Sequence, residues 1–233
     1  MATPAPTDMS EDQALAALQH ADLTASDLAA LARTSSALKS RKVVLGLVTH
    51  PRTPRHSSIP LLRRMFTFDL MRVTLTPAVP ADLKRLAEEQ ILVRVGTLSA
   101  GEKISLARRA SGRVAAALLQ DPDSRIVAAA LDNSRLTEPL LAAALANSNA
   151  PQALFDIASA HSTWSQRHDL QIALLRSEKT PLDKVLRFAN NFSADFLHEI
   201  LPESTRSALE ECQLGGDKPG KEPAGSNCET TRD

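Results

Sequence analysis

The stretch His50-Pro51-Arg52-Thr53-Pro54 interrupts a chain that otherwise consists mostly of Leu- and Ala-rich segments with helical spacing. A second break, Thr76-Pro77-Ala78-Val79-Pro80, has the same pattern. Both end in proline, which suits the first turn of a new helix because its missing N–H has no intrahelical partner there. Each break therefore predicts the end of one helix and the start of the next. Degenerate copies follow at 133–137, 147–151 and 177–181.

The composition indicates an all-α fold. The strong helix formers Leu and Ala account for 34 and 36 of the 233 residues, whereas only 3% are aromatic. No run of alternating β-branched residues is bounded by hairpin turns. We predict one helical domain over residues 10–211, between a flexible N-terminal tail, residues 1–9, and a disordered C-terminal tail, residues 212–233. The C-terminal tail has too few apolar residues to offset the entropy of ordering it.

A further helix boundary is predicted at Asp121-Pro122-Asp123. We expect Asp121 to be the N-cap of the helix that follows, with Pro122 as its first residue. The apolar residues on either side are expected to be buried between adjacent helices. These residues are Leu118, Leu119, Val127 and Leu131.

The breaks and the Asp-Pro-Asp corner together resemble the HEAT-like repeat superfamily, most closely its leucine-rich repeat variant branch. The resemblance covers roughly residues 25–200, with irregular spacings of 26, 57, 14 and 30 residues between the first positions of the breaks. The longest gap can contain one degraded break near residues 110–112. The resemblance implies a right-handed α-solenoid of short antiparallel helix pairs, an armadillo-like helical superhelix that acts as a non-enzymatic scaffold for protein–protein interactions.

The resemblance implies no cofactor. Some leucine-rich repeat variant proteins carry an iron–sulfur cluster on a cysteine-rich leader, but the only cysteines here are Cys212 and Cys228, in the C-terminal tail. Cysteines placed there cannot link the core, which fits a reducing compartment. No apolar stretch approaches the roughly 20 residues that span a bilayer, and residues 1–10 have no secretory signal pattern. We interpret the chain as soluble and cytoplasmic, without membrane insertion and with unknown oligomeric state.

No residue pattern indicates catalysis or metal binding. The six histidines are neither spaced as His-Glu-x-x-His nor paired with cysteine, and no glycine-rich phosphate loop occurs. Glu88 and Glu89 are adjacent and point in different directions on a helix, so we interpret them as a solvated face. We expect Trp164 to pack over a junction between repeats, with base stacking as the alternative. We therefore predict no catalytic, cofactor-binding or metal-binding residue.

Basic residues are concentrated in one segment although the formal net charge is zero. Residues 33–113 contain 16 Lys and Arg against 5 Asp and Glu. Successive solenoid helices can align such residues into a stripe that binds anions. The alternative to the protein scaffold is therefore a nucleic-acid-binding HEAT-like solenoid. A DNA glycosylase of that type is the weaker form, because it would need an acidic residue and aromatics on the same basic face. The candidate anion- or partner-binding residues are Arg41, Lys42, Arg63, Arg64, Lys84, Arg85, Arg108, Arg109 and Arg113.

Overall fold

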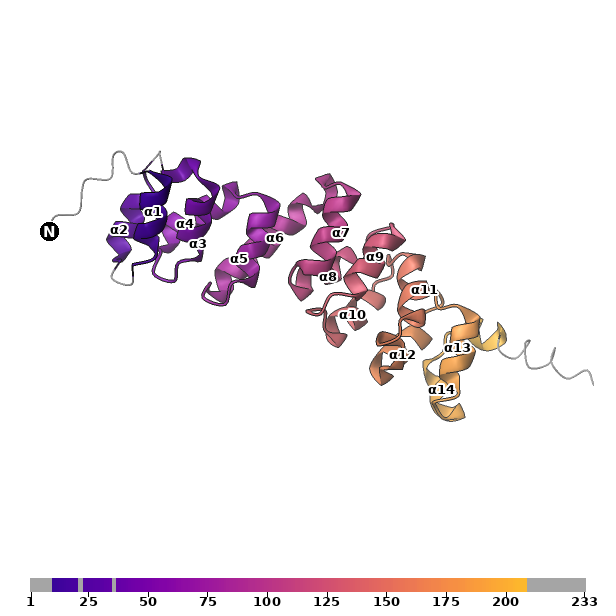
Figure 1. Cartoon of the computed structure of the whole chain (residues 1–233). Coiled ribbons are helices and arrows are strands. Elements are labelled where there is room, and N and C mark those ends of the chain that lie inside the picture. The colour runs from indigo at the N-terminus through magenta and orange to yellow at the C-terminus, as the bar shows by residue number, and fades with distance from the viewer. Residues whose placement is uncertain (1–9, 21–22, 35–36, 209–233) are drawn as a thin grey trace, which may run out of the picture.

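The structure, a computed structural model, describes residues 10–20, 23–34 and 37–208. Within these ranges the chain forms helices joined by short turns, and no β-strand occurs. The predicted all-α class is therefore confirmed (Figure 1). The two predicted tails, residues 1–9 and 212–233, lie outside the described residues.

Most of the helices are short. In chain order the elements up to residue 109 are α1 (Glu11–Leu18), α2 (Ala25–Leu31), the 3-10 helix η1 (Ala37–Lys39), α3 (Arg41–Thr49), α4 (Arg55–Arg64), α5 (Thr67–Leu75), α6 (Ala81–Arg94), the 3-10 helix η2 (Val95–Thr97) and α7 (Ala100–Arg109). The elements that follow are α8 (Gly112–Leu118), α9 (Ser124–Leu131), α10 (Glu138–Leu145), α11 (Gln152–Ala160), the 3-10 helix η3 (Trp164–Gln166), α12 (His168–Leu175), α13 (Leu182–Ala189) and α14 (Ala194–Ile200).

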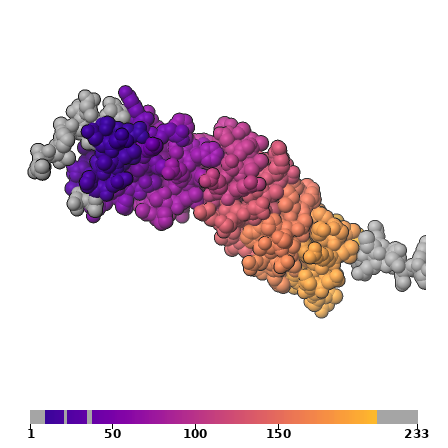
Figure 2. Space-filling model, viewed as in Figure 1, coloured from indigo at the N-terminus to yellow at the C-terminus, as the bar shows by residue number. Residues whose placement is uncertain are grey.

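The helices follow one another along an elongated body, as Figures 1 and 2 show. The main contacts join helices that are one or two positions apart in the chain. Helix α8 packs against α10 and α10 against α12, while α7 packs against α9 and α9 against α11. In the N-terminal half, α3 contacts both α1 and α5, and α4 packs against α6. The described part of the chain is thus built from local contacts along its length.

The five breaks share one corner geometry. In each, the carbonyl of the first residue accepts a hydrogen bond from the backbone N–H of the fourth residue. In four of them the first side chain also accepts the N–H of the third residue, as Asn133 Oδ1 does from Arg135 at 2.8 Å. Such side-chain bonds offer the backbone an alternative to the helix, so they hold the turn. The fourth residues are all buried: Thr53, Val79, Leu136, Ala150 and Thr180.

The fifth residue of each break is the N-cap of the next helix, so each break marks the start of a new helix, as predicted. Pro54 and Pro80 have extended ψ values of 144° and 148°, and their carbonyls accept the first bonds of α4 and α6. An N-cap residue needs extended ψ and an accepting carbonyl, and its N–H makes no helical bond. Proline meets all of these conditions.

A sixth, variant corner begins at His161, where the sequence predicted none. Its carbonyl accepts the backbone N–H of the fifth residue, Ser165, at 3.1 Å, instead of that of the fourth. His161 Nδ1 accepts the backbone N–H of Thr163 at 3.2 Å, as the first residues of other corners do. This corner divides the 30-residue gap between the breaks at 147–151 and 177–181. It is followed by Trp164, whose Nε1 donates to the Leu131 carbonyl at 2.9 Å. Trp164 therefore packs over the end of α9, as expected of a residue at a helix junction.

The predicted cap at the Asp-Pro-Asp corner was also wrong. Helix α9 begins at Ser124, and its N-cap is Asp123, which accepts the Arg125 N–H at 2.9 Å. Asp121 instead accepts the Asp123 N–H at 3.0 Å and a bond from Lys103 Nζ at 2.8 Å. Asp121 thus holds the turn and links it to α7, which places the helix start three residues after it. The degraded break predicted near residues 110–112 coincides with the junction between α7 and α8.

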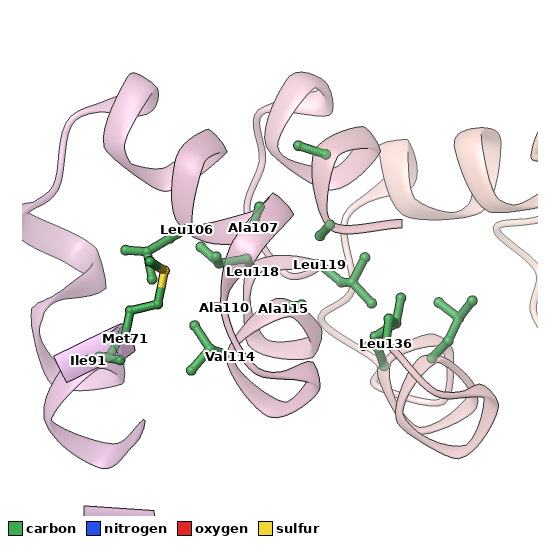
Figure 3. Packing of buried hydrophobic residues seen from close by; sticks show 14 of the residues in the cluster. Met71, Ile91, Leu106, Ala107, Ala110, Val114, Ala115, Leu118, Leu119 and Leu136 are labelled. Atoms are coloured by element: carbon green, nitrogen blue, oxygen red, sulfur yellow. The ribbon is translucent and has the colours of Figure 1, made fainter. Parts of the chain in front are cut away.

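One cluster of buried apolar side chains extends from Ala14 to Leu201. Figure 3 shows Met71 and Ile91 on one side, and Leu106 and Val114 on the other, of the interior that α5 and α6 share with α7 and α8. The residues predicted to be buried beside the Asp-Pro-Asp corner are all in this cluster, which confirms the prediction. Their exposed fractions are 2% or less: Leu118, Leu119, Val127 and Leu131.

Replacing Leu131→Ala should lower the free energy of unfolding by about 2–5 kcal/mol, because it removes a fully buried side chain and leaves a cavity. Urea denaturation followed by circular dichroism measures this loss. Leu186→Ala is the matched control, because Leu186 is 39% exposed. The packing described here would be contradicted if both substitutions destabilised the protein equally.

Replacing His50→Asn should make the protein less sensitive to mild acid. Partial burial, and secondly the Arg52 guanidinium, lower the pKa of His50 below 6.5. The unfolded chain therefore binds more protons just below pH 6.5, so the native state loses stability as the pH falls through that range. Asparagine makes the same bond at the corners that begin at Asn133 and Asn147 without titrating.

The measurement is urea denaturation of both proteins at about pH 7.5 and 5.5. Lowering the pH should reduce the free energy of unfolding of the unmodified protein more than that of the His50→Asn variant. An unchanged difference would show that His50 does not need to be neutral in its corner.

Candidate anion-binding and partner-binding sites

The nine candidate basic residues lie on five helices: α3, α4, α6, α7 and α8. All are exposed except Lys84, which is half-buried. The structure divides them into two groups. Arg41, Lys42 and Arg113 form ion pairs, whereas the other six have no hydrogen-bond or ion-pair partner for their side chains among the described residues. Only the second group is available to an external anion.

Arg41 connects α3 to α5. Its Nε and one terminal nitrogen both donate to Asp69 Oδ2, at 3.0 and 2.8 Å, and its guanidinium carbon lies 4.3 Å from the centre of the Phe66 ring. Arg41, Lys39 and Arg64 surround a small pocket of about 180 Å³ next to this ring. Asp69 lines the same pocket, so one of its cations is already neutralised.

Glu88 is a structural carboxylate, so its interpretation as a solvated residue was wrong. Its Oε1 accepts the Ser111 hydroxyl at 2.6 Å, and its Oε2 lies 3.7 Å from a nitrogen of Arg113. The side chain is only 15% exposed, because α6 packs against the start of α8 at this point. Glu89 is exposed, in agreement with the prediction for that residue.

The densest group of free cations lines a groove of about 500 Å³ between α5, the end of α7 and the turn between α9 and α10. We call it the arginine groove. Its other lining residues are apolar: Phe68, Met71 and Leu75, all on α5. No acidic side chain lines it within the described part of the chain. Its cations are Arg72, Arg108, Arg109 and Arg135.

Sequence reasoning found only half of this set. Arg108 and Arg109 are an obvious basic pair on α7, but Arg72 is isolated in the sequence and Arg135 lies outside the basic segment 33–113. Arg135 is the third residue of the corner that begins at Asn133. The corner pattern could have marked it as exposed, but no sequence signal places it beside α7.

Two contacts bring Arg135 to the end of α7. The Asn133 side chain donates to the carbonyls of Ala107 and Ala110, at 2.6 and 3.1 Å, and its exposed fraction is 2%. Gly112 lies directly against the Arg135 carbonyl, so that a Cβ there would be 2.1 Å from this oxygen. The corner that carries Arg135 is therefore fixed relative to Arg108 and Arg109.

A second groove of about 600 Å³ lies across α10 and α12, and we call it the alanine groove. Ala142, Ala143, Ala146 and Ala173 contribute most of its small side chains. At one edge, Lys179 Nζ donates to the carbonyls of Ser148 and Ala150, at 2.8 and 2.6 Å. These bonds connect the corners at 147–151 and 177–181 at the edge of the groove.

His161 and His168 make structural contacts. His161 Nε2 lies 3.4 Å from Asp132 Oδ1, and the His168 ring packs 5.0 Å from the Phe192 ring. Over the described residues, no three His, Cys, Asp or Glu side chains form a group that could hold a metal ion. No helix in that part of the chain is sufficiently long and apolar to span a membrane.

No protein-family model matches the chain, and neither the curated proteins nor the solved structures include a match to it. The resemblance to leucine-rich repeat variants therefore rests on the breaks themselves. The two grooves have to be interpreted from their own chemistry.

Replacing Glu88→Ala should lower the free energy of unfolding by about 1–3 kcal/mol, because the Ser111 hydroxyl loses a charged acceptor at a poorly exposed position. The adjacent substitution Glu89→Ala is a control with the same change in charge and should have little effect. Urea denaturation of the two variants checks this prediction. Equal stability of both would mean that Glu88 does not link α6 to α8.

Proposed function

We propose that the chain is a non-enzymatic right-handed α-solenoid of short antiparallel helix pairs that acts as a scaffold for protein–protein interactions. The observation that carries the proposal is the alanine groove, which extends across two helices and the corners that follow them. Its occupant is an extended segment of a partner protein.

The arrangement of the helices supports an interaction function. Chains built from local contacts between successive short helices form extended surfaces, which such proteins use for binding. The rows α8, α10, α12 and α7, α9, α11 have this kind of contact pattern. A long body also exposes more surface than a compact one of equal mass, so several partner segments can bind along it.

The lining of the alanine groove supports a peptide as occupant. Alanine has no side chain beyond Cβ, so apolar side chains of a partner can approach the helix backbone closely. Burial of their apolar surface contributes about 25 cal/mol per Å². Asp169 and Arg176 at the groove provide charges of both signs, which suits a segment of mixed polarity. The polar side chains around an apolar floor fix the register of such a segment.

Replacing Ala143→Arg or Ala146→Arg should weaken partner binding by at least about tenfold, because either side chain would fill the groove and place a charge on its apolar floor. Both residues are exposed, so the fold should tolerate the changes. Ala160→Arg, at an exposed position outside the groove, is the control.

The partner is purified with the tagged protein from its native source, and its affinity for each purified variant is then measured by isothermal titration calorimetry. Loss of binding in the two groove variants, with binding retained in the control, supports the proposal. A partner bound equally well by all variants would exclude the alanine groove as its site.

A further inference from the structure

We infer that the arginine groove binds the phosphate groups of a single-stranded nucleic acid. This inference does not depend on the scaffold proposal, because it concerns a different groove, on different helices.

The positive charge in the arginine groove is uncompensated within the described residues. Four guanidinium groups from three separate elements line one groove with no acidic residue among the lining side chains. Their mutual repulsion disfavours the folded state, and none of the four is relieved by an ion pair within the described residues. Some other cations of the basic segment are neutralised, as Arg41 is by Asp69 and Arg55 by Asp82. An anion bound in the groove would offset this repulsion and would be attracted by all four guanidinium groups.

The arginine groove is already assembled by contacts within the chain. Asn133 is buried and bonded to the end of α7, and the backbone at Gly112 lies against the Arg135 carbonyl. The backbone positions of Arg108, Arg109 and Arg135 are therefore fixed relative to one another before a ligand binds. The backbone position of Arg72 is also fixed, because Arg72 lies on α5, a regular helix whose Leu70 and Val73 are buried in the core. A preformed site loses less entropy on binding.

The type of cation in the groove favours phosphate as the ligand. All the cations that line the groove are arginines. The planar guanidinium group of arginine can donate two parallel hydrogen bonds to one phosphate. Further free cations, Arg63 and Arg64 on α4 and Lys84 and Arg85 on α6, lie on the two helices adjacent to α5 in the chain. Their long-range field favours a polyanion over a small monovalent anion.

The apolar part of the groove lining favours a single strand over other polyanions. Phe68, Met71 and Leu75 lie on α5 beside the guanidinium groups. In a single strand the faces of the bases are accessible and can pack against such side chains while the phosphates contact arginine. In a duplex the base faces are stacked inside, and an acidic peptide has no comparable flat group beside each charge. The lining therefore favours a single strand over both.

The test uses the full chain and a fluorescein-labelled oligothymidylate of about 12 nucleotides, with binding followed by fluorescence anisotropy from about 50 mM salt upward. Arg72→Gln combined with Arg135→Gln should weaken binding by at least about tenfold at low salt. If each arginine contacts one phosphate, the slope of log affinity against log salt should fall by about 1.4.

Arg167→Gln combined with Arg187→Gln removes the same charge from exposed positions outside the groove and should change binding little. Thermal melting should show that neither double variant is less stable than the unmodified protein. As a measurement that needs no variant, an oligomer carrying 5-iodouracil should crosslink to the peptide that contains Phe68.

Three results would overturn the inference. The first is no binding of the oligomer at about 50 mM salt, where electrostatic affinity is strongest. The second is equal weakening by the two double variants, or crosslinking only outside α5 and α7. The third is tighter binding of a duplex or of polyglutamate of similar length, which would assign the groove to another class of partner.

Discussion

The hydrogen bond from the fourth backbone N–H of each break to the carbonyl of the first residue is the interaction on which the rest of the structure depends. Helices of seven to ten residues are only marginally stable in isolation. The free-energy cost of nucleation exceeds the contribution of so few hydrogen bonds. They persist when corners of fixed geometry return each helix to its neighbours. The corner bond also turns the fourth residue inward, so the same turn that ends a helix contributes a side chain to the core.

Asn133 shows how this constraint extends from the fold to a binding site. As the first residue of its corner, it accepts the Arg135 N–H through its side-chain oxygen. Its side-chain nitrogen donates to two carbonyls at the end of α7. One buried amide thus satisfies the turn, caps a second helix and fixes Arg135 near Arg108 and Arg109. The arginine groove is therefore a consequence of the way in which the corner is packed.

The cations of the basic segment form two groups. Cations close to an acidic side chain form ion pairs, and the others remain free. Arg41, Arg113 and Lys103 each meet a carboxylate from another element: Asp69, Glu88 and Asp121. These pairs connect neighbouring helices. Arg72, Arg108, Arg109 and Arg135 line a groove to which none of the described residues contributes an acidic side chain. The two grooves therefore offer different chemistry to partners, with small apolar side chains across α10 and α12 and positive charge beside α5.

The sequence by itself determined the helical class, the positions of the breaks and the burial of residues such as Leu131, because these depend on local propensity and on apolar periodicity. It placed the N-cap of α9 at Asp121 instead of Asp123, because an aspartate side chain suits both a turn and an N-cap. Only the tertiary structure decided which charges remain free. Glu88 is half-buried and bonded to Ser111 at the start of α8, and Arg135 reaches α7 through Asn133. A side chain's partners lie on elements far away in the chain, so its neutralisation depends on packing that no local pattern encodes.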